Sequence, residues 1–384
     1  MNIFNSLGSN YSLGFALKAL LTPNKKEYSL ELKKFLEEKY DGKAILLYKG
    51  RQAMGLMLKI LNLPKESVVT INGFTCFAVY KAIESAGYGV ECLDIEPNDL
   101  NFTADELRQT IKQNPNIKVV VVQNTLGSPA DIENIAKICK EHDLILVEDL
   151  PHCVGTVYKN DKEAGTVGDF VTLSFSQDKM IDAVSGGALI IRNKQFGNRT
   201  IEQLNNIDNK QELIDRLYPL LTFKIRKTYP TDIGKFLHFF LKSFDLLSKP
   251  MREDLYDFYS LPNWYCSLIL SGFKELGTNL EHRKKIANIY NSMLPKKILQ
   301  SRIANLIDFS SNLRFPVFIE NRKRLINLLK IEGVYVSDIW YDSVSPDCPN
   351  AVNISAKILN LPTHKNVSEN DAREIAQKIN QWLQ

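Results

Sequence analysis

The six cysteines of this 384-residue sequence form no C-x-x-C pair and are scattered along the chain. A disulfide-stabilised domain and a cysteine-based zinc site both need patterned cysteines, so neither is expected. Four of the six have apolar neighbours, which is typical of reduced thiols in a cytosolic protein. We therefore expect no metal site and a cytoplasmic location. The cysteines are Cys76, Cys92, Cys139, Cys153, Cys266 and Cys348.

Long apolar runs are also missing. No stretch reaches the roughly 18 consecutive apolar residues that a membrane-spanning helix requires. The segment 1–21 lacks the basic start and the long apolar block of a secretion signal. The sequence therefore indicates neither a membrane-spanning protein nor a secreted one.

Surplus charge is scarce, since 48 basic and 44 acidic residues leave a formal net charge of +4. The sequence has no basic stripe with interleaved aromatic residues and no RNA-binding motif, so no nucleic-acid partner is expected. Its 44% hydrophobic and 24% charged residues are those of an ordinary globular protein. The length allows one large domain and a smaller one.

The first half of the sequence does show a regular alternation of strand-like and helix-like segments. Repeated units of this kind, with continuously apolar strands, indicate an α/β fold with a mostly parallel sheet between helices. Such sheets bind ligands at the carboxyl ends of their strands. The expected strands are 44–48, 67–71, 89–95, 118–123 and 144–149, and the helices are 51–61, 75–87, 104–113 and 131–142.

The second half has a different texture. Residues 195–260 are expected to be a mainly helical insert broken by prolines, and 263–292 one long helix. A small α/β unit follows from about 312 and ends in a helix capped by Ser368. We expect an N-terminal segment (1–25), a large domain (26–260) and a small C-terminal domain (261–384). The prolines taken as breaks are Pro219, Pro230 and Pro250.

An acid and a lysine follow neighbouring strands of the expected sheet. Asp149 ends the strand 144–149, and Lys179 comes thirty residues later, five after Ser174. Taken alone, Asp149 is explained as well by a helix cap or a salt bridge. Together the three suit pyridoxal phosphate, which needs a lysine for its aldehyde, a carboxylate for its ring nitrogen and donors for its phosphate.

The phosphate site is expected at the first strand-to-helix turn. In the segment "LLYKGRQAMGLML", Gly50 lies at the turn, and Arg51 opens the helix. Glycine lets a phosphate approach the backbone, and a helix N-terminus favours an anion. A turn glycine alone is a weak signal, so the order of turn, acid and lysine gives this assignment its value.

Seven segments of the sequence, in order, resemble motifs of the DegT/DnrJ/EryC1/StrS family of pyridoxal-phosphate aminotransferases. The resemblance runs from about residue 28 to the end. It implies the fold-type-I transferase fold, with a large domain around a mostly parallel sheet and a small α/β domain. The segments are "KGRQAM", "NGFTCFAVYKAI", "DIEP", "QNTLGSPADIENI", "LVEDLPHCVG", "GDFVTLSFSQDKMIDAVSGG" and "LPTHKNVSEND".

The resemblance also implies roles for individual residues. Lys179 is the lysine that bonds to the cofactor aldehyde, Asp149 pairs with the pyridine nitrogen, and Ser174 binds the phosphate, as do Gly50 and Arg51. His152 stands where the family often has a glutamine beside the ring. We also expect a homodimer, because sites of this fold are usually built between two chains.

Three positions depart from the family pattern. The aromatic residue that covers the cofactor ring aligns with Cys76, and Phe77 follows it as a possible substitute. Asn124 replaces a histidine. The segment 258–263, "FYSLPN", aligns loosely with a family segment that reaches across the dimer, but it lacks that segment's asparagine and arginine.

The insert contains an amphipathic stretch, 233–247, with lysines around it. The expected explanation is a helix packed on the core or on a partner chain. Contact with an anionic membrane surface is the alternative. One apolar face is expected to hold Ile233, Phe236, Leu237, Phe240, Leu241, Phe244 and Leu247.

By resemblance, the expected activity is transfer of an amino group from an amino-acid donor to a keto group, that of a nucleotide-activated sugar. One alternative is a related pyridoxal enzyme that acts on a non-sugar or lipid-linked ketone. The other is a scaffold or regulatory protein that kept the fold and lost turnover; the retained Lys179, Asp149 and Ser174 argue against it.

Overall fold

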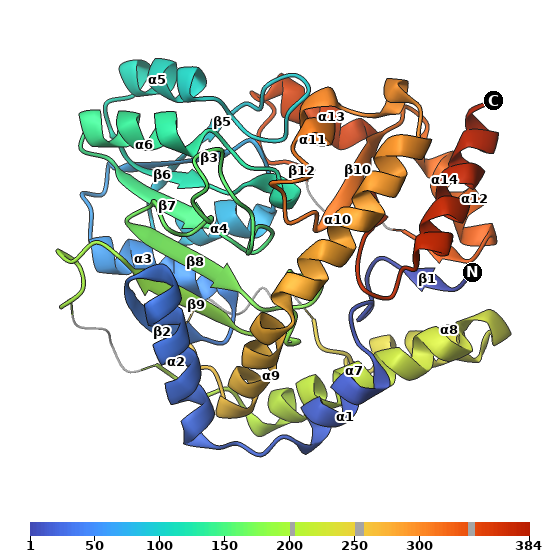
Figure 1. The fold of residues 1–384 in the computed structure, drawn as a ribbon. Coiled ribbons are helices and arrows are strands. Elements are labelled where there is room, and N and C mark those ends of the chain that lie inside the picture. Colours follow the sequence, from blue (N-terminus) through green and yellow to red (C-terminus); the bar gives the residue numbers. More distant parts are fainter. Residues whose placement is uncertain (200–203, 250–256, 337–341) are drawn as a thin grey trace.

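The computed structural model describes residues 1–199, 204–249, 257–336 and 342–384. Figure 1 shows a large α/β body and a smaller α/β unit joined by the helices α9 (Asn263–Lys274) and α10 (Leu276–Met293). Helices α1 (Leu13–Leu21), α7 (Asn209–Thr228) and α8 (Ile233–Ser243) extend along the lower edge of this view.

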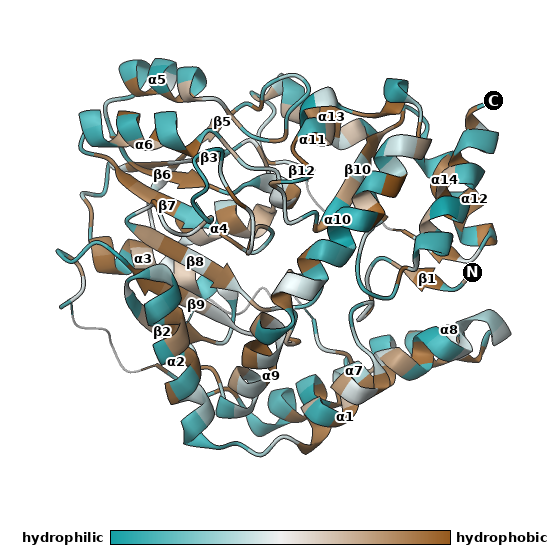
Figure 2. Ribbon diagram, viewed as in Figure 1, coloured by the Kyte–Doolittle hydropathy of each residue, from teal (hydrophilic) through white to brown (hydrophobic). Residues whose placement is uncertain are grey.

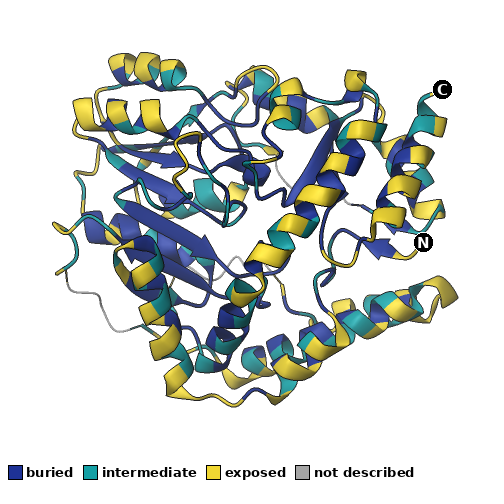
Figure 3. Ribbon diagram, in the orientation of Figure 1, coloured by how far each residue is buried: buried dark blue, intermediate teal, exposed yellow. Residues whose placement is uncertain are grey.

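A seven-stranded sheet forms the centre of the large body. Strand β9 runs opposite to the other six strands, so the sheet is mostly parallel, as the sequence predicts. Except for the edge strand Gly89–Leu93, its strands are mostly buried (Figure 3), as is expected for a sheet covered on both faces. In spatial order they are β2 (Lys43–Leu47), β9 (Gly187–Ile191), β8 (Phe170–Ser174), β7 (Ile145–Asp149), β6 (Ile117–Val122), β3 (Val68–Asn72) and β5 (Gly89–Leu93).

Successive side chains of each strand serve different layers of the core, because the side-chain period of a strand is two. In β6, Val120 and Val122 join the cluster that contains α2 (Lys26–Tyr40), α5 (Ala104–Gln113), α6 (Ile132–Glu141) and α9. Val119 and Val121 join the opposite cluster, with α3 (Gly50–Leu61) and α4 (Phe77–Ser85). Figure 2 shows the strands as the hydrophobic centre between these helices.

The smaller unit has its own core around the antiparallel pair β10 (Arg314–Phe318) and β13 (Ile358–Pro362). Helices α10, α12 (Arg322–Ile331) and α14 (Glu369–Leu383) cover this pair. The Ser368 hydroxyl accepts a hydrogen bond from the Asp371 amide (3.1 Å), which confirms the expected cap. The N-terminal strand β1 (Ile3–Phe4) pairs with β11 (Val334–Tyr335), so the chain start belongs to this unit.

Short elements complete the description and join the two bodies. The pair β4 (Phe74–Thr75) and β12 (Asp342–Ser343) links the large body to the C-terminal unit, and α13 (Pro349–Lys357) packs beside it. The remaining helix is α11 (Ser301–Asn305). The 3₁₀ turns are Thr125–Gly127, Tyr229–Thr231 and Lys296–Ile298.

Two sequence expectations about the helices are wrong. Pro219 does not break the insert, since it lies buried inside α7, where packing against α1 offsets the one lost backbone hydrogen bond. Residues 263–292 are two helices, because Glu275 ends α9 and α10 begins at Leu276. Pro230 does lie in the turn between α7 and α8, whereas Pro250 is outside the described residues.

Candidate active site

The register of the sheet brings the predicted site residues together. Asp149, the last residue of β7, is the ladder partner of Thr172 in β8. Ser174 ends β8 opposite Gly187 of β9, and β2 on the far side of β9 leads into the turn at Gly50. The acid and the phosphate turn therefore lie at one edge of the sheet, at the carboxyl ends of its parallel strands.

Asp149 is buried, with 5% of its surface exposed, and its carboxylate is held by two donors. The Thr172 hydroxyl donates to Oδ1, and Gln123 Nε2 donates to Oδ2 over 3.1 Å. Burial raises the pKa of Asp149, and these two hydrogen bonds offset part of the increase. A carboxylate fixed in this way is suited to pairing with one specific cation.

Lys179 lies on the loop between β8 and β9, and its amine is 3.1 Å from Nε2 of His152. Burial lowers the pKa of Lys179, and the nearby Asp149 carboxylate and Cys76 side chain oppose that shift. A lowered pKa favours the neutral amine, which is the nucleophilic form. The shift therefore moves Lys179 toward the form that bonding to an aldehyde requires.

His152 is buried and is fixed through its backbone, because the Ser311 hydroxyl donates to its carbonyl oxygen over 2.7 Å. Burial, with the positive charges of Lys179 and Arg314, lowers the pKa of His152 well below its ordinary value. The imidazole is thus neutral near pH 7, with one nitrogen as donor and the other as acceptor.

The loop that carries Lys179 is anchored by a residue that the sequence does not reveal as important, Asp182. Its carboxylate accepts hydrogen bonds from the backbone amides of Asp178 (2.8 Å) and Val184 (3.1 Å). The Tyr11 hydroxyl donates to the same carboxylate over 2.5 Å. The N-terminal segment therefore helps to hold the lysine loop in place.

The turn at the start of α3 leaves little space around Gly50. A Cβ added there would lie 2.5 Å from Ser174 Cβ and 2.9 Å from Ser174 Oγ. Arg51 is the next residue of α3, and the first backbone amides of this helix face the end of the sheet. This close approach of backbone, hydroxyl and helix N-terminus is the arrangement that binds phosphate groups.

The two candidates for covering the cofactor ring differ in position. Phe77 is 53% exposed and stacks on Tyr80, with 5.6 Å between ring centroids. Cys76 precedes it at the N-terminus of α4 and is close enough to Lys179 to affect the lysine pKa. The structure thus brings Cys76, rather than the Phe77 ring, to the lysine.

The segment aligned with the family's cross-dimer motif lies against its own chain. Tyr48 donates its backbone amide to Tyr259 O over 2.9 Å, and Leu47 pairs with Ser260. Asn124 is also internal, since its side chain donates to the Tyr158 hydroxyl over 2.8 Å. Both departures from the family pattern are therefore held by contacts within the chain.

Residues missed by the sequence reasoning fit pyridoxal phosphate as well. The buried Oε1 of Gln123 has no hydrogen-bond partner among the described residues, so an acceptor is open beside Asp149. The Gln123 amide therefore holds Asp149 through its nitrogen and has an acceptor left for a donor group of a bound cofactor. Gln123 immediately follows β6, so the rule that singled out Asp149 at the end of β7 would also have found it.

The fold is that of a pyridoxal-phosphate-dependent transferase of fold type I. This follows from the strand order of the sheet, the position of Lys179 on its loop and the tight turn at Gly50. Comparison with known sequences gives the particular family, since residues 18–219 and 258–380 match the DegT/DnrJ/EryC1/StrS aminotransferase family. The chain belongs to this family, whose aminotransferases depend on pyridoxal phosphate.

Relatives agree with this assignment over nearly the full length. The chain is 26% identical over 374 residues to the UDP-4-amino-4,6-dideoxy-N-acetyl-beta-L-altrosamine transaminase of Campylobacter jejuni, covering 92% of this chain and 89% of that protein. The fold matches an aminotransferase from Psychrobacter cryohalolentis with a TM-score of 0.73 and 16% identity, over 97% of both chains. It also matches a Helicobacter pylori aminotransferase of pseudoaminic acid biosynthesis, with a TM-score of 0.70 and 18% identity over 96% of both chains.

Proposed function

We propose that this protein transfers an amino group from an amino acid to the keto group of a nucleotide-activated sugar. The observation that carries the proposal is the Lys179 amine 3.1 Å from His152, beside the strand that ends in Asp149. The Campylobacter relative supports the substrate class, because its name describes a transaminase of a UDP-linked sugar. Glutamate is the donor that the family resemblance suggests.

Pyridoxal phosphate, when bound, supplies an aldehyde that bonds to amines and a protonated ring that withdraws electrons from the attached carbon. Lys179 would hold this group covalently and, once displaced by a substrate amine, would move a proton to and from the reacting carbon. A lowered pKa suits that work, because it makes the Lys179 amine easier to deprotonate than an ordinary lysine.

His152 would position the Lys179 amine. Their 3.1 Å contact fixes the direction of the amine, and the neutral imidazole adds no repelling charge. As a second contact, a ring nitrogen of His152 can donate a hydrogen bond to an oxygen of the cofactor. The bond from Ser311 holds the imidazole-bearing loop still during the reaction.

Asp149 would keep the ring nitrogen of the cofactor protonated. The buried carboxylate stabilises a cation more strongly than an exposed one would, because the low dielectric strengthens the attraction. Thr172 and Gln123 fix its two oxygens so that it need not reorganise. Gly50, Arg51 and Ser174 would bind the phosphate at the other end of the cofactor.

We also propose a cytoplasmic homodimer. The free cysteines among the described residues suit a reducing compartment, and the family resemblance favours a site completed by a second chain. Equilibrium sedimentation of the purified protein measures the dimer directly; a monomer at micromolar concentration would contradict this part of the proposal.

The proposed function is tested first by absorption spectroscopy. The purified protein, or the protein reconstituted with pyridoxal phosphate, should show a visible band that borohydride abolishes and Lys179→Ala lacks. Glutamate should then bleach this band as the amino group moves to the cofactor. A protein that never binds pyridoxal phosphate would refute the proposal and favour a scaffold.

Substrate class is tested by offering the glutamate-treated enzyme several ketones. A UDP-, GDP- or dTDP-linked keto sugar should restore the visible band, and the same sugar without its nucleotide should not. Recovery only with a lipid-linked or non-sugar ketone would establish the alternative enzyme and reject the nucleotide-sugar assignment.

A further inference from the structure

Residues 220–257 lie between the two parts of the chain that match the family. Within this range the structure describes 220–249 and 257, which include the end of α7 and the whole of α8. In Figure 1, α8 projects along the lower right edge, beside the smaller unit. The shared activity of the family gives no account of this helix.

Helix α8 exposes a row of large apolar side chains to solvent. Ile233, Phe236 and Phe240 follow one another at steps of three or four residues, so they lie on one face of the helix, and Phe244, the residue that caps its end, continues the same spacing. They are 63%, 72%, 44% and 63% exposed, and the neighbouring Phe239 is 71% exposed. Figure 3 shows most of α8 as exposed, in contrast to the buried sheet. Aromatic residues gathered in this way on a surface mark an interaction site.

Positive charge surrounds this apolar face. Residues 220–249 contain six basic and two acidic residues, a net charge of +4, which equals the net charge of the whole chain. Lys235 and Lys242 lie on α8 itself, and Lys224 and Lys227 precede it on α7, all four exposed. The rest of the sequence is therefore neutral in sum, and the surplus charge is concentrated where the phenylalanines are.

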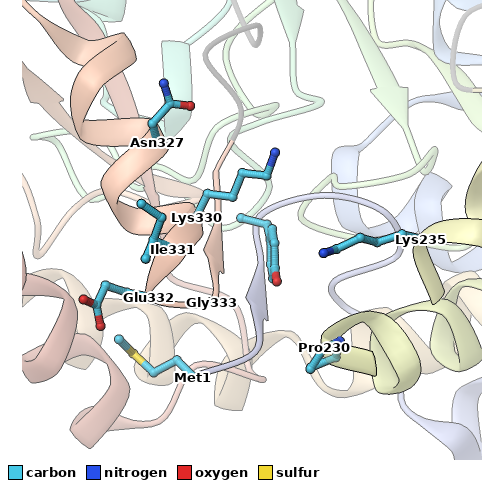
Figure 4. Close-up of a pocket in the computed structure, with 9 residues that line it drawn as sticks. Met1, Pro230, Lys235, Asn327, Lys330, Ile331, Glu332 and Gly333 are labelled. Carbon is cyan, nitrogen blue, oxygen red and sulfur yellow. The ribbon is translucent and has the colours of Figure 1, made fainter. Parts of the chain in front are cut away.

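A pocket of about 840 Å³ lies beside α8, between its first turn and α12. Figure 4 shows the amines of Lys235 and Lys330 directed into the same space from opposite walls. Lys235 also pairs with the exposed Asp232, a weak contact that does not hold the lysine away from a ligand. The acidic residue of the wall, Glu332, is paired with Lys378 at 3.1 Å. The pocket thus presents two converging cations.

We propose that α8 and this pocket dock the protein on the surface of an anionic lipid bilayer. The phenylalanine row would enter the boundary between headgroups and acyl chains, while Lys235 and Lys330 bind lipid phosphates. No helix among the described residues is long and apolar enough to cross a bilayer, so the contact is peripheral. A second copy is a poorer occupant, because its own basic rim would face this one.

The docking surface is connected to the active site through the residues that follow α8. Gln177, two residues before Lys179, donates its side-chain amide to Ser248 O over 2.9 Å. Lys49, next to Gly50, donates to Lys249 O over 3.4 Å. The residues that follow α8 therefore contact both the lysine loop and the turn before Gly50, and they connect the docking surface to the site.

Vesicle flotation of the full-length protein tests the proposal. Wild type should float with vesicles of phosphatidylcholine and phosphatidylglycerol, and it should remain behind with phosphatidylcholine alone. Binding should weaken in about 1 M salt, where charges are screened beyond about 3 Å. Lys235→Gln with Lys330→Gln should reduce binding about 25-fold, since each lysine near an anionic surface contributes about fivefold.

Matched variants distinguish vesicle binding by the apolar face of α8 from non-specific binding through any exposed apolar residue. The triple variant Phe236→Ser, Phe240→Ser, Phe244→Ser should lose flotation, and its exposed positions allow normal folding. Leu30→Ser with Val352→Ser removes exposed side chains (58% and 46%) from α2 and α13, well away from α8 in Figure 1, and should bind as wild type does.

Two results would overturn the proposal. The first is a wild-type protein that does not bind anionic vesicles; if the triple variant then also has a lower molar mass than wild type by light scattering, this face is an interface between two copies. The second is a triple variant that floats as well as wild type.

Discussion

Substitution of Gly50 by alanine asks whether the turn before α3 binds the cofactor phosphate. The added methyl would lie 2.5 Å from Ser174 Cβ, a distance that side-chain carbons do not adopt. The helix cannot retreat, because Gly187 lies against it on the neighbouring strand. A Cβ on Gly187 would itself be 2.6 Å from the Gly50 nitrogen.

The expected loss of cofactor affinity depends on which group shifts to make room for the added methyl. Over-packing of a close contact costs about 1–3 kcal/mol. Relief requires a shift of either Ser174 or the Gly50 backbone, and both are the proposed phosphate contacts. If that energy is lost from binding, the affinity for pyridoxal phosphate falls by about fivefold to about 150-fold.

Titration of the cofactor-free protein with pyridoxal phosphate, followed by absorption, measures this loss. Gly55→Ala is the matched control, because Gly55 lies in the same helix and its added methyl would meet Phe258 at an ordinary 3.4 Å. Alanine is favoured over glycine inside a helix by about 1 kcal/mol. We therefore expect Gly55→Ala to bind the cofactor normally and to unfold at the same temperature or a higher one.

Two outcomes would refute the reasoning. Unchanged cofactor affinity in Gly50→Ala would mean that the phosphate does not approach this turn. An equal loss in both variants would show a general response of α3 to substitution. A loss confined to Gly50→Ala, with the fold intact by circular dichroism, is the result that the structure requires.

Further predictions concern the acid and the lysine. Lys179→Ala should abolish turnover and leave pyridoxal phosphate removable by dialysis, whereas wild type retains it. Asp149→Asn should lower turnover by about tenfold to about 150-fold, the equivalent of a lost charged hydrogen bond of about 1.5–3 kcal/mol; Thr172→Ser, which keeps the hydroxyl donor to Asp149, should change it little. Burial lowers the pKa of Lys179 in the folded state below its ordinary 10.5. Between these two pKa values the folded state binds fewer protons at Lys179 than the unfolded state does, so the stability attributable to this lysine rises with pH. In urea unfolding without cofactor, Lys179→Met should therefore exceed wild type in stability at pH 7, and the difference should shrink toward pH 10; a pH-independent difference would contradict the assignment.

Much of the sheet could be predicted from the sequence, because its strands are apolar runs bounded by clear helix signals. The Thr103 cap of α5, for example, accepts the Glu106 amide over 3.1 Å, as its pattern indicates. Strand direction was not predictable, since apolar periodicity is the same for β9 and for its parallel neighbours. The end of α9 at Glu275 was also hidden, because two abutting helices share one continuous apolar pattern.

The residues of the candidate site that the local sequence pattern marks were predictable. Asp149 and Ser174 end adjacent strands, and the strand order alone then brings Lys179 to them. Asp182 was not predictable in the same way. Its role depends on Tyr11, 171 residues away, and a contact at that separation leaves no local pattern. Residues that react are thus easier to find than residues that hold them in place.

The amphipathic insert shows why a helical pattern alone does not identify a binding partner. The sequence places seven apolar residues on one face of the stretch 233–247, which predicts a single contact. In the structure this face divides into two rows. Leu241 is buried where α8 packs on α7, and Leu237 and Leu247 are half-buried, whereas Phe236 and Phe244 are exposed. Packing on α7 and contact with a membrane are therefore compatible, because each uses a different row of this segment.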